Sequence, residues 1–157
     1  MTELPLFPLQ TVLFPGGLLS LKVFEARYLD LVSTCLRERR PFGVVALLKG
    51  HEVRRSEDTI VFEDIGVMAE RLEVDSTQPG ILQLRCRGTQ RFRIGSTRQQ
   101  ADGLWIGRVQ MLPDDDDAAP GESLHETVRG LANAIASLKG KGVEPFEQPY
   151  QFDSAGW

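Results

Sequence analysis

Short apolar segments separated by glycine and proline turns constrain the fold of this chain more than any other feature. Several of these segments alternate apolar and polar residues, which is typical of strands with one buried face. Turns are expected between them, at Pro15-Gly16-Gly17, Pro79-Gly80 and Asp102-Gly103. Only two longer segments have a helical repeat, so the pattern predicts an α+β fold of many short, mostly antiparallel strands.

The two helical repeats lie early and late in the chain. In the first, apolar or aromatic residues recur at intervals of four, three and four: Phe24, Tyr28, Leu31 and Cys35. This repeat predicts an amphipathic helix over residues 25–39, ended by Pro41. The second repeat has the same character: Leu124, Val128, Leu131, Ile135 and Leu138. It predicts a helix over residues 123–139 that follows the strands.

Two of the predicted strands have distinctive compositions. Residues 4–14 alternate apolar side chains but are interrupted by Pro5 and Pro8. Because proline lacks the N–H that a sheet requires, this segment is predicted to be an edge strand or an irregular extended segment. Residues 42–48 are nearly all apolar, which indicates a strand buried on both faces.

A further pair of alternating segments flanks Gly88-Thr89 and is rich in arginine. Residues 82–87 and 91–94 predict a hairpin with one apolar face. Its other face carries four arginines, which we call the arginine patch: Arg85, Arg87, Arg91 and Arg93. Like charges on facing strands repel, so the patch needs neutralising groups. Carboxylates of the chain are one explanation, and an acidic peptide or a nucleic-acid backbone is the other. Candidate carboxylates are Glu63, Glu70 and Glu73.

Charge and cysteine content narrow the class of protein. The formal charge of the 157 residues is -4, and the aspartates at 114–117 account for four negative charges. The remainder is nearly neutral, so no partner follows from overall charge. Cys35 and Cys86 stand among apolar neighbours, as reduced thiols of a cytoplasmic protein do. No apolar run approaches the roughly 20 residues that span a bilayer, so no membrane partner is expected.

Motifs for catalysis and metal binding are missing from the sequence. His51 and His125 each precede a glutamate, but arginine stands where the second histidine of an H-E-x-x-H zinc site would be. The cysteines lack C-x-x-C spacing, and there is neither a glycine-rich phosphate loop nor a G-x-S-x-G nucleophile turn. The sequence therefore predicts a protein that is not an enzyme and has no catalytic residues, metal or cofactor.

Several motifs follow one another in order along the first 94 residues. Residues 4–9 read L-P-L-F-P-L, residues 12–16 read V-L-F-P-G, and residues 19–28 read L-S-L-K-V-F-E-A-R-Y. Further on stand Phe42-Gly43-Val44-Val45, and Gly88 with Arg91-Phe92-Arg93-Ile94. This series resembles the N-terminal domain family of the Lon proteases, which has a proline-bracketed strand, an F-P-G turn, an F-E-x-R-Y helix start and a G-x-x-R-F-x-I hairpin.

The resemblance implies a PUA-like, partly open β-barrel with one inserted helix and a C-terminal helical appendage. Residues 1–112 are expected to form the barrel domain, including helix 25–39. Residues 113–157 are expected to hold an acidic loop, helix 123–139 and, at 153–157, the start of a helical lobe, as in a truncated chain. Unlike the proteases, the chain has no nucleotide-binding motif and no room for a proteolytic domain. It therefore resembles a stand-alone relative of the kind found in bacteria.

The resemblance also implies a function, because the domain engages unfolded or tagged substrate proteins in Lon. We expect a non-catalytic module that binds unfolded or extended polypeptide. The expected surface surrounds the first strand and the F-P-G turn, at Leu6, Phe7, Leu9, Phe14 and Pro15. Alternatives are an RNA-binding module that uses the arginine patch and a sensor of a small ligand. Nucleic acid is less favoured, because no aromatic side chain alternates with the arginines on their face.

Overall fold

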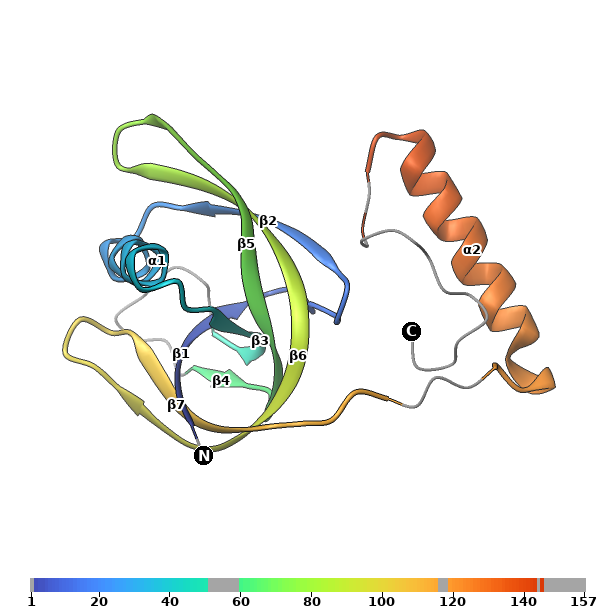
Figure 1. The fold of residues 1–157 in the computed structure, drawn as a ribbon, viewed down its shortest axis with the longest axis horizontal. Helices are drawn as coiled ribbons and strands as arrows, with labels where there is room; N and C mark the ends of the chain where they lie inside the picture. Colours follow the sequence, from blue (N-terminus) through green and yellow to red (C-terminus); the bar gives the residue numbers. More distant parts are fainter. Residues whose placement is uncertain (1, 51–59, 116–118, 144, 146–157) are drawn as a thin grey trace.

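The computed structural model describes residues 2–50, 60–115, 119–143 and 145, and its central feature is a mostly antiparallel sheet (Figure 1). The strands are β1 (Thr2–Leu9), β2 (Leu18–Val23), β3 (Phe42–Lys49), β4 (Val61–Phe62), β5 (Ile65–Gln78), β6 (Ile81–Gln99) and β7 (Trp105–Met111). The order β1-β7-β6-β5-β3 returns to β1 through a parallel β1–β3 pairing, so the sheet is partly ring-like. β2 pairs with β6 and β4 pairs with β3. With its two helices, this arrangement confirms the predicted α+β class.

β1 has neighbouring strands on both sides, which corrects its predicted position at an edge. Residues 2–6 run antiparallel to β7, and residues 6–9 run parallel to β3. Pro5 therefore lies where β7 alone is in register with β1, and Pro8 lies where β3 alone is. Each proline can direct its missing N–H toward the side without a ladder, so a strand with two prolines fits inside the ring.

β6 is one continuous strand, so the predicted hairpin at Gly88-Thr89 is wrong. The chain reverses earlier, at Pro79-Gly80, where Gly80 has a φ of 75°. After this turn β6 stays paired with β5, with shifts of register that include one between Val67 and Ala69. Such irregularities let a long strand bend. The two alternating segments that suggested a hairpin therefore belong to one bent strand.

Two glycines make room for Phe92, whose side chain is fully buried. A Cβ atom at Gly43 of β3 would stand 2.7 Å from Cζ of Phe92, and one at Gly66 of β5 would stand 2.5 Å from the same atom. Real Cβ atoms do not approach other atoms so closely, so both positions require glycine. Around the Phe92 ring the core continues with Leu4, Leu6, Val45 and Val109.

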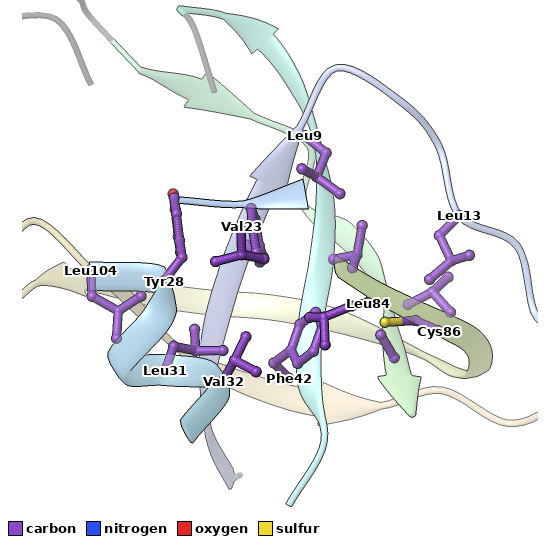
Figure 2. Close-up of a cluster of buried hydrophobic side chains, with 14 of the residues drawn as sticks. Leu9, Leu13, Val23, Tyr28, Leu31, Val32, Phe42, Leu84, Cys86 and Leu104 are labelled. Atoms are coloured by element: carbon purple, nitrogen blue, oxygen red, sulfur yellow. The ribbon is translucent and has the colours of Figure 1, made fainter. Parts of the chain in front are cut away.

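A second group of buried side chains lies between helix α1 (Ala26–Glu38) and the sheet (Figure 2). Tyr28, Leu31 and Val32 come from the buried face of α1. The ring of Tyr28 stacks on that of Phe7 from β1, with 4.0 Å between centroids. α1 therefore occupies nearly the predicted residues, and its buried face is the predicted one. Phe24 is an exception: it is 51% exposed, because it precedes the helix and helical spacing does not apply to it.

Helix α2 (His125–Gly140) follows a short 3-10 turn (Glu122–Leu124), two residues later than the predicted start. Figure 1 shows α2 to one side of the sheet. Of its apolar stripe, Ile135 is buried, while Leu131 and Leu138 are more than a third exposed. The predicted start of a helical lobe at 153–157 lies outside the described residues.

Candidate functional site

The residues predicted to bind polypeptide fall into two groups. Leu6, Phe7 and Leu9 are at most 5% exposed, because β1 runs inside the ring and its side chains fill the two cores. These three side chains therefore form no surface in this structure, which corrects the expectation. Phe14 and Pro15 of the F-P-G turn are exposed, and the exposed fraction of Phe14 is 56%.

The F-P-G turn is fixed against β6 at Gly88. The N–H of Gly16 donates to the carbonyl oxygen of Gly88, and the N–H of Gly88 donates to that of Gly17, each at 2.9 Å. A Cβ atom at Gly88 would overlap the carbonyl oxygen of Phe14. Gly88 therefore packs against the F-P-G turn and binds it through backbone hydrogen bonds; it is not the turn of a hairpin.

The arginine patch is partly neutralised within the molecule. Arg87 donates to Glu70 at 2.5 Å, and Arg91 donates to Asp115 at 2.8 Å and to the carbonyl oxygen of Pro113 at 3.3 Å. The pairing of Arg87 with Glu70 confirms one of the predicted carboxylates. Within the part of the chain that the structure describes, Arg85 and Arg93 form no ion pair. The patch is thus a surface of positive and negative side chains, not a continuous positive one.

A groove of about 670 Å³ lies between the C-terminal half of α1 and β5, and we call it the α1–β5 groove. Its apolar lining comes from helix α1 and from strands β3, β5 and β6: Val32, Leu36, Phe42, Ala69 and Leu84. Its charged lining consists of Arg39, Arg40, Glu70 and Arg71. Val32, Phe42, Ala69 and Leu84 are at most 3% exposed, so the apolar floor open to a ligand comes from the partly exposed Cys35, Leu36 and Pro41. A small apolar floor with a charged rim is typical of sites that bind a ligand in a fixed orientation.

Beside this groove, β5 has an edge without a neighbouring strand. β3 is in register with β5 only as far as Ala69, and among the described residues β6 is the only partner of β5 beyond it. Arg71, Leu72 and Glu73 are all exposed, although successive residues of a strand point to opposite faces. Leu72 is the extra residue of a β-bulge against β6. The groove is thus bordered by backbone N–H and C=O groups that an added strand could use.

Cys35 gives the helical wall of the groove a neutral thiol. Its Sγ lies 3.9 Å from the carbonyl oxygen of Pro41, and burial together with the charge of Glu38 raises the pKa of the thiol. At neutral pH the group is therefore protonated and behaves as a small apolar side chain. Burial also raises the pKa of the Cys86 thiol, in the core, to about 11.

One feature of the sequence, outside the motifs discussed above, marks one wall of the groove. Residues 37–40 read R-E-R-R at the end of the predicted first helix. Two of these arginines line the groove. Arg71 lines the other side of the groove. It belongs to β5, and the position of β5 relative to the helix could not be derived from spacing along the chain.

Two other classes of site find no support in the described ranges. There, no group of three or more histidine, cysteine or acidic side chains is placed to hold a metal ion. Nor does any helix there combine the length and the apolar character needed to cross a membrane.

Known structures share this fold. The chain is similar to the Lon N-terminal domain protein from Xanthomonas campestris, with 33% identity and a TM-score of 0.77, over 100% of this chain and 78% of that one. The N-terminal domain of Mycobacterium avium complex Lon protease has the same fold at 15% identity, with a TM-score of 0.59, over 90% of this chain and 70% of the other.

Curated relatives match in sequence over part of their length. Protein cereblon from Xenopus tropicalis is 29% identical over 123 residues, which is 78% of this chain and 26% of cereblon. Lon protease from Porphyromonas gingivalis is 26% identical over 143 residues, 90% of this chain and 16% of the protease. The chain thus spans about a quarter or less of these relatives. The family model of the ATP-dependent protease La (LON) substrate-binding domain matches residues 3–155, and the chain belongs to this family.

Proposed function

We propose that this protein is a non-catalytic recognition module that binds extended polypeptide in the α1–β5 groove. The observation that carries the proposal is the groove itself, in which apolar side chains of the helix and the sheet lie beside an unpaired stretch of β5. Membership in a substrate-binding domain family supports the same function. The free thiols of Cys35 and Cys86 favour a reducing compartment such as the cytoplasm.

An extended segment suits this groove better than a compact ligand. Its backbone could pair with the edge of β5, and alternate side chains would then point toward the apolar floor. Phe14 and Pro15 remain a second exposed surface on which a longer polypeptide could rest.

RNA binding has weaker support than polypeptide binding. Arg87 and Arg91 already form ion pairs with carboxylates, so RNA would have to displace Glu70 and Asp115. Displacing existing partners offsets part of the gain from phosphate contacts.

Protection of Cys35 tests the proposed site on the unmodified protein. Cys35 lines the groove and is partly exposed, while Cys86 is fully buried. A reduced, unfolded test protein whose own cysteines are blocked should slow the alkylation of Cys35 by N-ethylmaleimide several-fold at saturation. Binding measured by fluorescence anisotropy with an unchanged alkylation rate would place the polypeptide elsewhere.

A pair of variants provides the second test. Leu36→Asp puts a charge on the apolar wall of the groove, whereas Leu131→Asp makes the same change on the exposed stripe of α2. We expect the first to weaken binding of the unfolded protein about tenfold or more and the second to leave it unchanged. Thermal unfolding of both variants shows whether a loss of binding reflects a loss of fold. Equal binding by the folded variants would contradict the proposal.

A further inference from the structure

We infer that the polypeptide segment held in the α1–β5 groove is acidic, with carboxylates on either side of an apolar residue. The inference rests on the proposed function and names the chemistry of the segment that the groove selects. Its basis is the charge of the groove lining, which carries three arginines and one glutamate in a chain of formal charge -4. The local charge thus has the opposite sign to that of the whole protein.

Ion pairs within the protein leave this positive charge largely uncompensated. Glu70 is held by Arg87 at 2.5 Å, so it does not neutralise the arginines of the groove. Arg40 has only a 3.4 Å contact with Glu38, and both side chains are well exposed. Arg39 and Arg71 form no ion pair with any residue that the structure describes. These two guanidinium groups are therefore available to carboxylates of a partner.

The positions of the two arginines argue that they act together. Arg39 ends α1, where cations interact favourably with the helix dipole, and this could account for Arg39 alone. Arg71 belongs to β5 on the other side of the groove, where no helix end explains it. Arg39 also has a φ of 55°, a conformation in which arginine is uncommon and asparagine or glycine is preferred. Both arginines are exposed at the rim of the groove, where side chains of an extended ligand that point away from the floor can reach them.

The floor of the groove specifies the rest of the ligand. Leu36 and Pro41 are partly exposed and offer apolar surface, and Cys35 adds a protonated thiol that does not repel an acidic ligand. An apolar side chain of the ligand would fill this floor, while carboxylates of its neighbours reach Arg39 and Arg71. A segment made only of apolar residues would leave both guanidinium groups without partners.

Two labelled peptides test the inference on the full chain. Each has nine residues with leucine at the centre, flanked by glutamates in one and by glutamines in the other. Fluorescence anisotropy at low salt should give about 3- to 30-fold tighter binding of the glutamate peptide, from two exposed charge pairs. Added salt should reduce the difference, because it screens exposed charges.

The matched variants remove two charges in different places. Arg39→Asn with Arg71→Gln takes both from the groove, and asparagine suits the positive φ at position 39. Arg93→Gln with Arg108→Gln makes the same change in net charge at exposed sites on β6 and β7. The preference for the glutamate peptide should disappear in the first double variant and persist in the second.

Each other outcome overturns a distinct statement. If wild-type protein binds both peptides equally and both protect Cys35, the groove binds polypeptide without selecting acid, and the inference is wrong while the proposed function stands. If neither peptide nor the unfolded protein protects Cys35, the proposed site is wrong as well. If a short single-stranded RNA binds more tightly than either peptide, and the groove double variant no longer binds it, the ligand is a nucleic acid.

Discussion

The guanidinium of Arg27 donates a hydrogen bond to the carbonyl oxygen of Gly103, 2.8 Å away, and so ties the start of α1 to the turn between β6 and β7. The same side chain forms an ion pair with Glu25 at 2.7 Å and lies over the ring of Tyr28, 4.6 Å from its centroid. Arg27 is only 9% exposed. The arginine of the F-E-x-R-Y motif therefore has a structural role that fixes α1 on the sheet.

Replacing Arg27 with methionine should lower the free energy of unfolding by about 2 to 4 kcal/mol. The change keeps the apolar stem but removes the charged donor that binds both Glu25 and the Gly103 carbonyl. Urea unfolding followed by tryptophan fluorescence measures the loss. Arg98→Met is the control, because its pair with Glu3 is more than half exposed on both sides and should cost less than about 1 kcal/mol. Similar losses in both variants would contradict the role assigned to Arg27.

A methyl group at Gly88 should detach the F-P-G turn from β6. Because a Cβ at this position overlaps the carbonyl oxygen of Phe14, we expect Gly88→Ala to destabilise the protein by about 2 kcal/mol or more. Gly130→Ala is the matched control, since a Cβ there meets nothing within 4 Å in helix α2 and should be neutral or stabilising. Hydrogen exchange of the Gly16 amide, which is bonded to Gly88, should quicken in the first variant alone.

Stability at alkaline pH should depend on Cys86. Its pKa of about 11 in the fold lies above that of an unfolded thiol, about 8.5 to 9, so the folded state holds the proton over a range in which the unfolded state releases it. This contribution is fully present below about pH 8 and is lost as pH rises toward 11. The stability difference between wild type and Cys86→Ala should therefore shrink by about 2 kcal/mol between pH 8 and pH 10.5. A constant difference across that range would contradict the assignment.

The reactivity of Cys35 should report its raised pKa. Below that pKa the thiolate fraction, and hence the alkylation rate, rises about tenfold per pH unit. We expect this rise to continue above pH 9 for Cys35, whereas a short unstructured peptide with one cysteine levels off. Mass spectrometry of the digested protein separates Cys35 from Cys86, which should stay unmodified until the protein unfolds. An early plateau for Cys35 would show that its environment does not disfavour the thiolate.

The elements that could be predicted from the sequence are those whose pattern is local. The repeat from Tyr28 to Cys35 and the apolar run at 42–48 each determine their own element, and α1 and β3 lie within a residue or so of the expected bounds. The turns at Gly80 and Gly103 also stand where expected, with φ of 75° and 92°. Such features depend on neighbours a few residues away.

The features that could not be predicted depend on residues far apart in the chain. The structural role of Arg27 could not be predicted, because nothing in the helical repeat points to a carbonyl at position 103. Sequence alone predicts a turn at Gly88, because the close approach of Gly88 to Phe14 arises only in three dimensions. The candidate site could not be predicted for the same reason, since Arg39 and Arg71 line a groove whose two walls come from separate elements.

The position of β1 has a consequence for synthesis of the chain on the ribosome. β1 emerges well before β7, and Thr2 pairs with Val109, so the strand lacks one of its neighbours until β7 has been made. The β5–β6 hairpin, by contrast, involves residues close in sequence and can form earlier. Until the ring closes, the apolar side chains of β1 lack part of the core that covers them in the finished fold, and such exposed apolar surface favours aggregation.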